Sequence, residues 1–442
     1  MHTVAQALLS DAWAMAGISV AIVCLFGMGE LLRRGLGVEA EATRKLAHVG
    51  GGFVVLLFPW IVSSAWTVLA LSIAFFGILL AGRISGVLGS VHAVDRRTSG
   101  AELYPAAVIG TWWLSDGEPL RFCVPMAVMA AADAGAAFVG KRMGTVNFRV
   151  MDGQRSLEGS HTFFSIAFAI FLVGLAIDGR GGWPGVLLIA LVGAVITTCV
   201  EAISVRGIDN VLIPWSGWLV TDRLLRLGLA EMSGWITGML VSFIAVLVGF
   251  SAAKLQPAAA LAAFVFGTLA WALGGVGWFL PIAALGLVFA ALHPAVREVD
   301  LEHVVPLAIG AVILTGALAY AGGGAAGATP YLAALAASGA IALWRMNTDG
   351  EAGVARRALA VLPGPARGLL GAAVPVAPTL LLSPSGDLAL TSPRVLGLVL
   401  SSALVGVAAW FPLRHFPRAG RRLVAAIVAG TVAWGRFHLG WF

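Results

Sequence analysis

Apolar runs of about 17–22 residues recur from one end of this 442-residue chain to the other. A helix needs about 20 apolar residues to cross the roughly 30 Å hydrocarbon core of a bilayer, where every backbone polar group must be satisfied within the protein. No period-two alternation, which is typical of strands, competes with these runs. The sequence therefore predicts an all-α fold, a polytopic transmembrane helical bundle of roughly 14–15 spans.

The composition supports the same class of protein. Hydrophobic residues make up 59% of the chain and charged residues only 11%, whereas about 25% of a typical soluble domain is charged. The formal net charge is +6, but the basic residues cluster in short loops between the apolar runs. Membrane topology explains that pattern, so we expect no nucleic-acid partner.

Eight spans are predicted in the amino-terminal half. They cover about residues 13–32, 46–63, 65–82, 103–115, 121–140, 160–177, 184–202 and 234–252. Segment 208–220 contains Pro214 and is too short to span comfortably, so it indicates a re-entrant or interfacial piece. The loops 33–45, 83–102, 141–159 and 203–233 are basic, and the positive-inside rule predicts that all four are cytoplasmic.

The carboxy-terminal half is rich in Ala, Gly and Leu and contains no acid within an apolar run. Seven further spans are predicted near 257–273, 276–293, 304–321, 328–344, 367–383, 395–412 and 421–437. Span parity puts the basic segment 345–367 on the side opposite to the other basic loops, so at least one span is miscounted. We predict two domains, a catalytic one at 1–253 and a second helical module of unknown function at 254–442.

Asp133 lies inside an otherwise apolar helix of small residues. An unpaired charge at mid-bilayer costs roughly 2.5–3.5 kcal/mol, so its carboxylate must face a partner, a cation or a wet cavity. Helical spacing brings Asp133, Ala137, Gly140 and Gly144 close to one face. Asp133 is therefore a candidate to bind Mg²⁺ or to accept a proton from an alcohol; the alternative is a structural pair with an Arg or Lys.

A basic, glycine-punctuated loop follows this helix. Lys141 and Arg142 stand beside Gly140 and Gly144, where the backbone could approach phosphate oxygens, although residues that only set topology would look the same. A helix beginning near Ser160 would turn its free N–H groups toward the loop as an anion site. Ser160 could equally be only an N-cap.

Three basic residues open the second span. Arg44 and His48 share a helical face and Lys45 is positioned to reach the interface. They either hold a nucleotide or lipid phosphate or form a simple interfacial anchor.

Three further acidic positions are candidates. Glu102 has the capping-box spacing from Ser99; the rival role is to coordinate a metal or orient a substrate hydroxyl. Glu201 ends an apolar run and could share a divalent ion with Asp133, while Asp209 and Asn210 follow it as site residues or as a simple turn.

Four motifs, in this order, resemble the polyprenol kinases, the dolichol kinase and phytol kinase group, which is related more distantly to the phosphatidate cytidylyltransferases. They are EATRKLAHVGGG, RRTSGAELYP, DAGAAFVGKRMG followed by RSLEGSHTFF, and EAISVRGIDNVLIP, and the resemblance covers roughly residues 30–250. It implies an integral membrane kinase that uses CTP, or another nucleoside triphosphate, and Mg²⁺. The implied acceptor is a membrane lipid, a long-chain isoprenoid alcohol such as phytol, farnesol, geranylgeraniol or dolichol.

The resemblance also implies roles for individual residues. Asp133, Glu201 and Glu158 are the expected catalytic residues, with Asp133 and Glu201 as Mg²⁺ ligands. Nucleotide or phosphate binding is expected of Arg44, Lys45, His48, Gly140, Lys141, Arg142, Gly144, Arg155, Ser156, Gly159 and Ser160, and a substrate-binding or supporting role of Glu102, Asp209 and Asn210. Arg155 departs from the family, which commonly has lysine there, so phosphate geometry is expected to differ.

Two other readings compete with the kinase. A CTP-dependent lipid cytidylyltransferase would need a His-Gly-Gly-x-x-Asp-Arg signature, and this chain has only Thr221-Asp222-Arg223. A non-catalytic transporter or scaffold would place polar residues mid-membrane in both halves, whereas they gather in the first. We expect an integral protein of the bacterial inner membrane with its active site on the cytoplasmic side.

Overall fold

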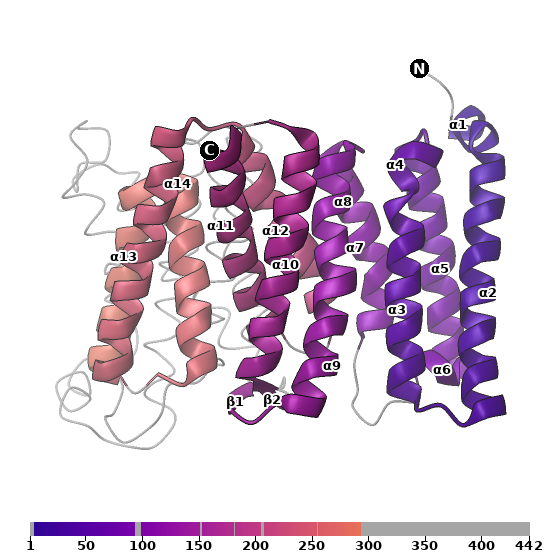
Figure 1. Cartoon of the computed structure of the whole chain (residues 1–442), viewed down its shortest axis with the longest axis horizontal. Helices are drawn as coiled ribbons and strands as arrows, with labels where there is room; N and C mark the ends of the chain where they lie inside the picture. The colour runs from indigo at the N-terminus through magenta and orange to yellow at the C-terminus, as the bar shows by residue number, and fades with distance from the viewer. Residues whose placement is uncertain are drawn as a thin grey trace, which may run out of the picture. The chain divides into compact units, whose positions relative to one another are not determined.

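The computed structural model of the protein describes residues 4–92, 99–150, 153–180, 182–204, 207–253 and 255–292 (Figure 1). The predicted spans from residue 304 onward lie outside these ranges. The chain divides into two units between Met232 and Ser233, and each is described by itself. The functional division predicted at residue 253 stays a prediction.

The described residues are almost entirely helical, which confirms the predicted fold class. The helices are α1 Val4–Ser10, α2 Ala12–Leu36, α3 Ala40–Leu56, α4 Phe58–Ile61, α5 Ala65–Ser85, α6 Gly89–His92, α7 Gly100–Ser115, α8 Pro119–Ala127, the π-helix η1 Val128–Ala132, α9 Asp133–Met143, α10 Leu157–Asp178, α11 Gly182–Ile203, α12 Asp209–Leu225, α13 Leu229–Ala253 and α14 Pro257–Leu292. Two short antiparallel strands, β1 Asn147–Val150 and β2 Gly153–Ser156, form a hairpin between α9 and α10.

Six helical stretches in the described part of the chain are long and apolar enough to cross a membrane. They are Ala12–Leu36, Ala65–Ser85, Pro119–Met143, Leu157–Asp178, Gly182–Ile203 and Leu229–Val248. Each agrees with a predicted span to within five residues at either end. The protein is therefore an integral membrane protein of the polytopic helical class.

Helix α3 begins earlier and ends earlier than the predicted span 46–63. It stops at Leu56 and α4 follows at Phe58, because Pro59 has no N–H to donate to the Val55 carbonyl four residues back. Because α3 begins at Ala40, Arg44 and Lys45 lie inside the helix, about one turn from its start, rather than in the loop before it.

Several connections of the first unit meet on one side of the bundle, here called the hairpin side because β1 and β2 lie there, at the bottom of Figure 1. Lys141, at the end of α9, pairs with Glu39 before α3 at 3.1 Å. Asn210 at the start of α12 donates to the Gly100 carbonyl at the start of α7, at 2.7 Å. The described parts of the predicted loops 33–45, 83–102 and 141–159 therefore share one side.

Segment 208–220 is not the short re-entrant piece that was predicted. It belongs to α12, a continuous 17-residue helix of about 25 Å that packs against α7, α8 and α11. The segment looked too short because the helix continues past Val220 to Leu225, and Pro214 lies inside the helix without ending it. Its polar residues Asn210, Thr221 and Asp222 are buried against neighbouring helices. Arg223 and Arg226, predicted on the hairpin side, therefore lie at the opposite end of this helix.

The second unit includes most of α13, from Ser233 onward, and all of α14. Helix α14 covers the predicted span 257–273 and residues 276–292 of the next predicted span. Gly275, at the predicted break, has a φ of +62°, a left-handed conformation that glycine adopts without steric cost.

Candidate active site

Asp133 lies at the centre of a group of charged side chains from four helices. It is only 8% exposed, and Lys45 Nζ of α3 donates to its Oδ2 in a close ion pair. His48 Nε2, one turn further along α3, lies 3.6 Å from the same oxygen. The buried carboxylate thus has a cationic partner, as its cost in a membrane requires.

A π-helical turn sets the position of Asp133. Residues 128–132 form η1, and Asp133 follows immediately. Such turns interrupt the regular hydrogen-bond ladder and are frequent at functional sites. Here the Met129 carbonyl is 3.1 Å from His48 Nε2, and because a carbonyl can only accept, Nε2 carries the proton. In the neutral ring Nδ1 is then left as an acceptor.

Arg155, from β2, joins a second set of acids. Its Nη1 is 3.1 Å from Glu201 Oε1 at the end of α11, and its Nη2 is 3.8 Å from Asp209 Oδ2 at the start of α12. The same nitrogen donates to the Ser204 carbonyl at 3.5 Å. A planar guanidinium with several donors can serve all these acceptors at once.

The two sets form one electrostatic unit. Asp133 interacts electrostatically with Arg155, Glu201 and Asp209. We call Lys45, His48, Asp133, Arg155, Glu201 and Asp209 the charged cluster. It contains three carboxylates and two permanent cations, Lys45 and Arg155, so its formal charge is one negative unit. Every member is among the site residues that the sequence predicted, and the roles predicted for them stay predictions.

Arg44 and Asn210 border the charged cluster. Arg44 is paired with Glu41 of the same helix, at 2.7 and 3.1 Å, and it interacts electrostatically with Asp133 and Asp209. Asn210 ties α12 to α7 through the Gly100 carbonyl. Glu41 and the Met129 and Ser204 carbonyls were not predicted, since no sequence signal marks a π-turn or an exposed carbonyl.

Glu158 holds the hairpin loop in place. Its Oε1 accepts from the Thr145 and Val146 amides at 2.9 and 3.2 Å, and from the Thr145 hydroxyl in a short hydrogen bond. Ser156, not Ser160, is the N-cap of α10, accepting from the Gly159 amide at 3.1 Å. Helix α10 therefore begins at Leu157, three residues earlier than predicted. A catalytic role for Glu158 stays a prediction.

Three predicted phosphate-binding glycines lie at a tight helix–helix contact. A Cβ on Gly140 would come within 2.9 Å of Ser156 Oγ, and one on Gly144 within 2.4 Å of the Gly140 carbonyl. A Cβ on Gly159 would lie 3.1 Å from the Ala136 carbonyl. These glycines let α9 and α10 approach each other; contact with phosphate is an additional role that stays a prediction.

The other predicted cations and Glu102 lie outside the charged cluster. Lys141 is 69% exposed by side chain and pairs with Glu39, and the Arg142 guanidinium lies over the Phe138 ring at 4.3 Å. Glu102 is buried and pairs with Arg83 at 2.9 Å. The predicted capping box is wrong, because Ser99 makes no side-chain cap hydrogen bond.

Oxygen donors suited to Mg²⁺ are present in the charged cluster, but they are engaged by protein cations. Within the described residues no group of three His, Cys, Asp or Glu side chains is arranged to hold a metal ion. Mg²⁺ in phosphoryl-transfer sites is commonly held by one or two carboxylates together with substrate phosphates. The carboxylates and the surplus negative charge fit that mode, and the assignment to Asp133 and Glu201 stays a prediction.

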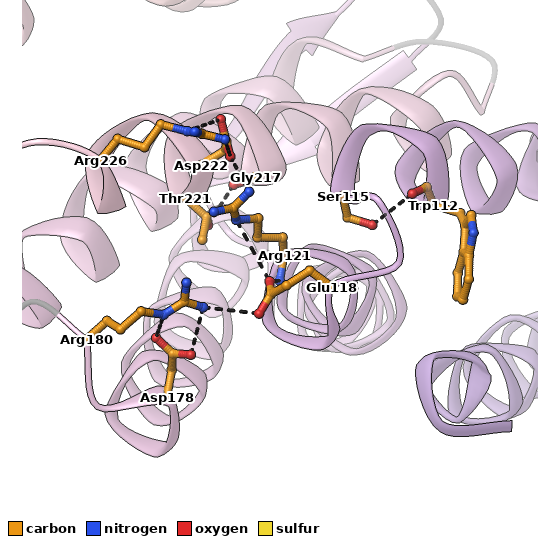
Figure 2. Close-up of polar contacts among 10 residues, drawn as sticks. All are labelled: Trp112, Ser115, Glu118, Arg121, Asp178, Arg180, Gly217, Thr221, Asp222 and Arg226. Atoms are coloured by element: carbon orange, nitrogen blue, oxygen red, sulfur yellow. Dashed lines mark hydrogen bonds and ion pairs between the residues drawn. The ribbon is translucent and has the colours of Figure 1, made fainter. Parts of the chain in front are cut away.

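A second charged network lies at the other end of the bundle from the hairpin. Figure 2 shows Arg121 between Glu118 and Asp222, and Arg180 between Glu118 and Asp178. Asp222 is fully buried and is also held by Arg226 at 2.8 Å. The network contains equal numbers of acids and bases, so it ties helix ends together without excess charge. Along α12, Asp222 lies about 20 Å from Asp209.

The protein is a polytopic integral membrane protein, and its helical bundle contains a buried charged cluster at one end. Over 194 residues the chain is 31% identical to "Phytol kinase" from Synechocystis sp. (strain ATCC 27184 / PCC 6803 / Kazusa), covering 43% of this chain and 82% of that protein. The chain belongs to the phytol kinase-like, or polyprenol kinase, family. No family model and no solved structure matches it.

Proposed function

We propose that this protein is a kinase that transfers the γ-phosphate of CTP, or of another nucleoside triphosphate, to a long-chain isoprenoid alcohol. The observation that carries the proposal is Asp133, buried in the charged cluster of a chain related to a phytol kinase. Phosphoryl transfer depends mainly on positioning and charge stabilisation, and the charged cluster supplies both signs of charge. The site faces the cytoplasm of a bacterial cell, where nucleotides are available.

Lys45 and Arg155 are the residues that stabilise charge on the phosphates. Each is now paired with a carboxylate, so nucleotide binding exchanges a protein anion for phosphate oxygens. Mg²⁺ would be held by Asp133 with Glu201 or Asp209, and it supplies neutralisation of charge between the phosphates. Asp133 is then released from Lys45, which becomes free to contact the nucleotide.

The transfer itself needs few groups. The alcohol oxygen forms a bond to the γ-phosphorus while the bond from that phosphorus to the bridging oxygen breaks, and the nucleoside diphosphate leaves. The alcohol proton passes to a base of the charged cluster. The candidates are the Asp133 carboxylate and the neutral His48 ring, whose Nδ1 accepts.

The experiment is a label-transfer assay on the purified protein with Mg²⁺, isoprenoid alcohols and CTP labelled at either the γ or the α position. We expect γ-label in the alcohol, and we expect Asp133→Asn to abolish transfer while the melting temperature and membrane insertion are kept. A folded Asp133→Asn protein of normal activity would remove Asp133 from the site.

The cytidylyltransferase alternative predicts α-label in a lipid nucleotide when phosphatidic acid is supplied. The structure gives it little support, because Asp222 of Thr221-Asp222-Arg223 is bound by Arg121 and Arg226 about 20 Å along α12 from Asp209. Transfer of α-label would overturn the kinase proposal. Absence of transfer from CTP, ATP and UTP would favour a transporter or scaffold.

A further inference from the structure

An apolar cavity lies between α2, α3, α5 and α7 of the first unit, and it borders the charged cluster. Most of its lining is aliphatic or aromatic and comes from all four helices, for example Ile22, Val55, Phe75 and Val108. Polar groups occur mainly at one end, where Arg44, His48 and Asn210 line it. His48 connects this end to Asp133, because its Nε2 is 3.6 Å from the carboxylate.

The cavity is the size of a short branched hydrocarbon. Its volume is about 110 Å³, whereas an apolar cavity of about 150 Å³ holds one benzene molecule with its six carbon atoms. It therefore has room for about four to five non-hydrogen atoms, which corresponds to about one five-carbon isoprene unit.

Gly51 keeps the cavity open, and its neighbour Gly52 does not. A Cβ on Gly51 would meet only Ile22 Cδ1 at 4.0 Å, and both residues line the cavity. A Cβ on Gly52 would instead lie 2.4 Å from Ala130 Cβ, in the packing between α3 and η1. A side chain added at Gly51 would therefore take up cavity volume rather than push helices apart.

Tyr104 adds a polar group to the lining. Its ring packs edge-on against His48, with centroids 5.3 Å apart, and its hydroxyl is buried with no hydrogen-bond partner among the described residues. A buried unpaired hydroxyl is costly. A ligand that brings its own hydroxyl to the His48 end of the cavity would offer that partner.

We propose that this cavity binds the hydroxyl end and the first isoprene unit of the alcohol, with the hydroxyl between Tyr104 and His48 and the rest of a longer chain outside. The reaction of the bound alcohol rests on the proposed kinase function. The location of the binding site is a separate claim that can be tested without it. Lipid tails are as apolar as the cavity wall, so recognition comes from shape and from the hydroxyl rather than from hydrophobic transfer.

A second apolar groove gives the matched comparison. It is formed by Leu56 and Trp60, by Val124 of α8, and by α10 residues such as Ala169 and Val173. None of its lining residues belongs to the charged cluster, so an alcohol bound there would have no hydroxyl partner at Asp133. Ala169→Leu in this groove is the control for Gly51→Leu in the cavity.

The first test compares five-, ten-, fifteen- and twenty-carbon isoprenoid alcohols as acceptors. For Gly51→Leu, kcat/KM should fall about tenfold or more for all four alcohols, because each places its first isoprene unit in the cavity. Ala169→Leu should leave all four unchanged. An unchanged kcat/KM in Gly51→Leu, or an equal loss in Ala169→Leu, would overturn the assignment.

The second test measures binding without turnover. A farnesol analogue carrying a photoreactive diazirine near its hydroxyl end is irradiated with the full-length protein in the absence of nucleotide, and labelled peptides are mapped. Label on α3 and α7, lost in Gly51→Leu, supports the cavity; label on α10 that persists in Gly51→Leu overturns it. Labelling of the cavity in a protein that transfers no phosphate would refute the kinase function and leave the binding site intact.

Discussion

The Arg155 side chain joins β2 to the end of α11 and to the start of α12. It contacts Glu201, Asp209 and the Ser204 carbonyl, at a position where the motif resemblance leads us to expect lysine. A lysine ammonium is a compact point charge and cannot span acceptors that a planar fork reaches together. The departure from the family pattern therefore has a structural consequence, the bridging of two acids from different helices.

Arg155→Lys should keep the fold and lower kcat/KM for the nucleotide by about tenfold to a hundredfold. A hydrogen bond to a charged group contributes about 1.5–3 kcal/mol, and about 1.4 kcal/mol corresponds to a factor of ten. Arg155→Gln, which removes the charge, should lose more. Steady-state kinetics with the nucleotide varied provides the measurement. A lysine variant with unchanged kinetics would show that bridging Glu201 and Asp209 is unimportant for catalysis.

At the scale of elements, the contact between α3 and the π-turn η1 positions the charged cluster. Gly52 allows the close approach, since a Cβ there would clash with Ala130, and His48 bonds the Met129 carbonyl that η1 presents. Lys45 and His48 on one helix then reach Asp133 on the other. The geometry of the site depends on this packing as much as on the charged residues.

Gly52→Val should lower the free energy of unfolding by about 1–3 kcal/mol through overpacking, and it should reduce activity because α3 moves away from Asp133. Gly51→Ala is the matched control for stability: it adds a Cβ where there is room, and alanine is favoured over glycine within a helix by roughly 0.5–1 kcal/mol.

Thermal unfolding of the detergent-purified variants, with intrinsic tryptophan fluorescence as the readout, distinguishes the two adjacent positions. Equal melting temperatures for Gly52→Val and Gly51→Ala would contradict the role assigned to the α3–η1 contact.

At the scale of the whole molecule, α12 changes the predicted topology. It begins beside Gly100 and ends beside Arg121, so it is one more crossing than the sequence predicted. The basic segment 345–367, which span parity put on the opposite side, lies outside the described residues, so its side stays a prediction.

A protein ending after Ala253 should retain phosphoryl transfer within a few fold of the full chain. The phytol kinase relative is roughly 240 residues long, because 194 matched residues are 82% of it, and the charged cluster and the cavity lie entirely within residues 1–232. Activity is compared after gel filtration shows a monodisperse sample. A folded but inactive shortened protein would show that later residues contribute to the site.

The sequence alone determined the fold class and the six long apolar helices, and it marked the members of the charged cluster as candidates. Apolar length and period are local properties that a bilayer enforces on any chain, and an acid such as Asp133 in an apolar helix is visible without a structure. The motifs also indicated the family, which the relative from Synechocystis confirmed.

Only the tertiary structure decided which charged side chains meet and which helix contact or cavity each glycine makes possible. The pairing of Lys45 with Asp133, the π-turn before it, the path of α12 and the cavity beside Gly51 all depend on contacts between segments far apart in the chain. Helical periodicity specifies the faces of one helix, but it does not specify which neighbour covers each face. Ser156 rather than Ser160 caps α10, and Glu158 and Gly140 have structural contacts that the sequence did not reveal, because each contact involves another element.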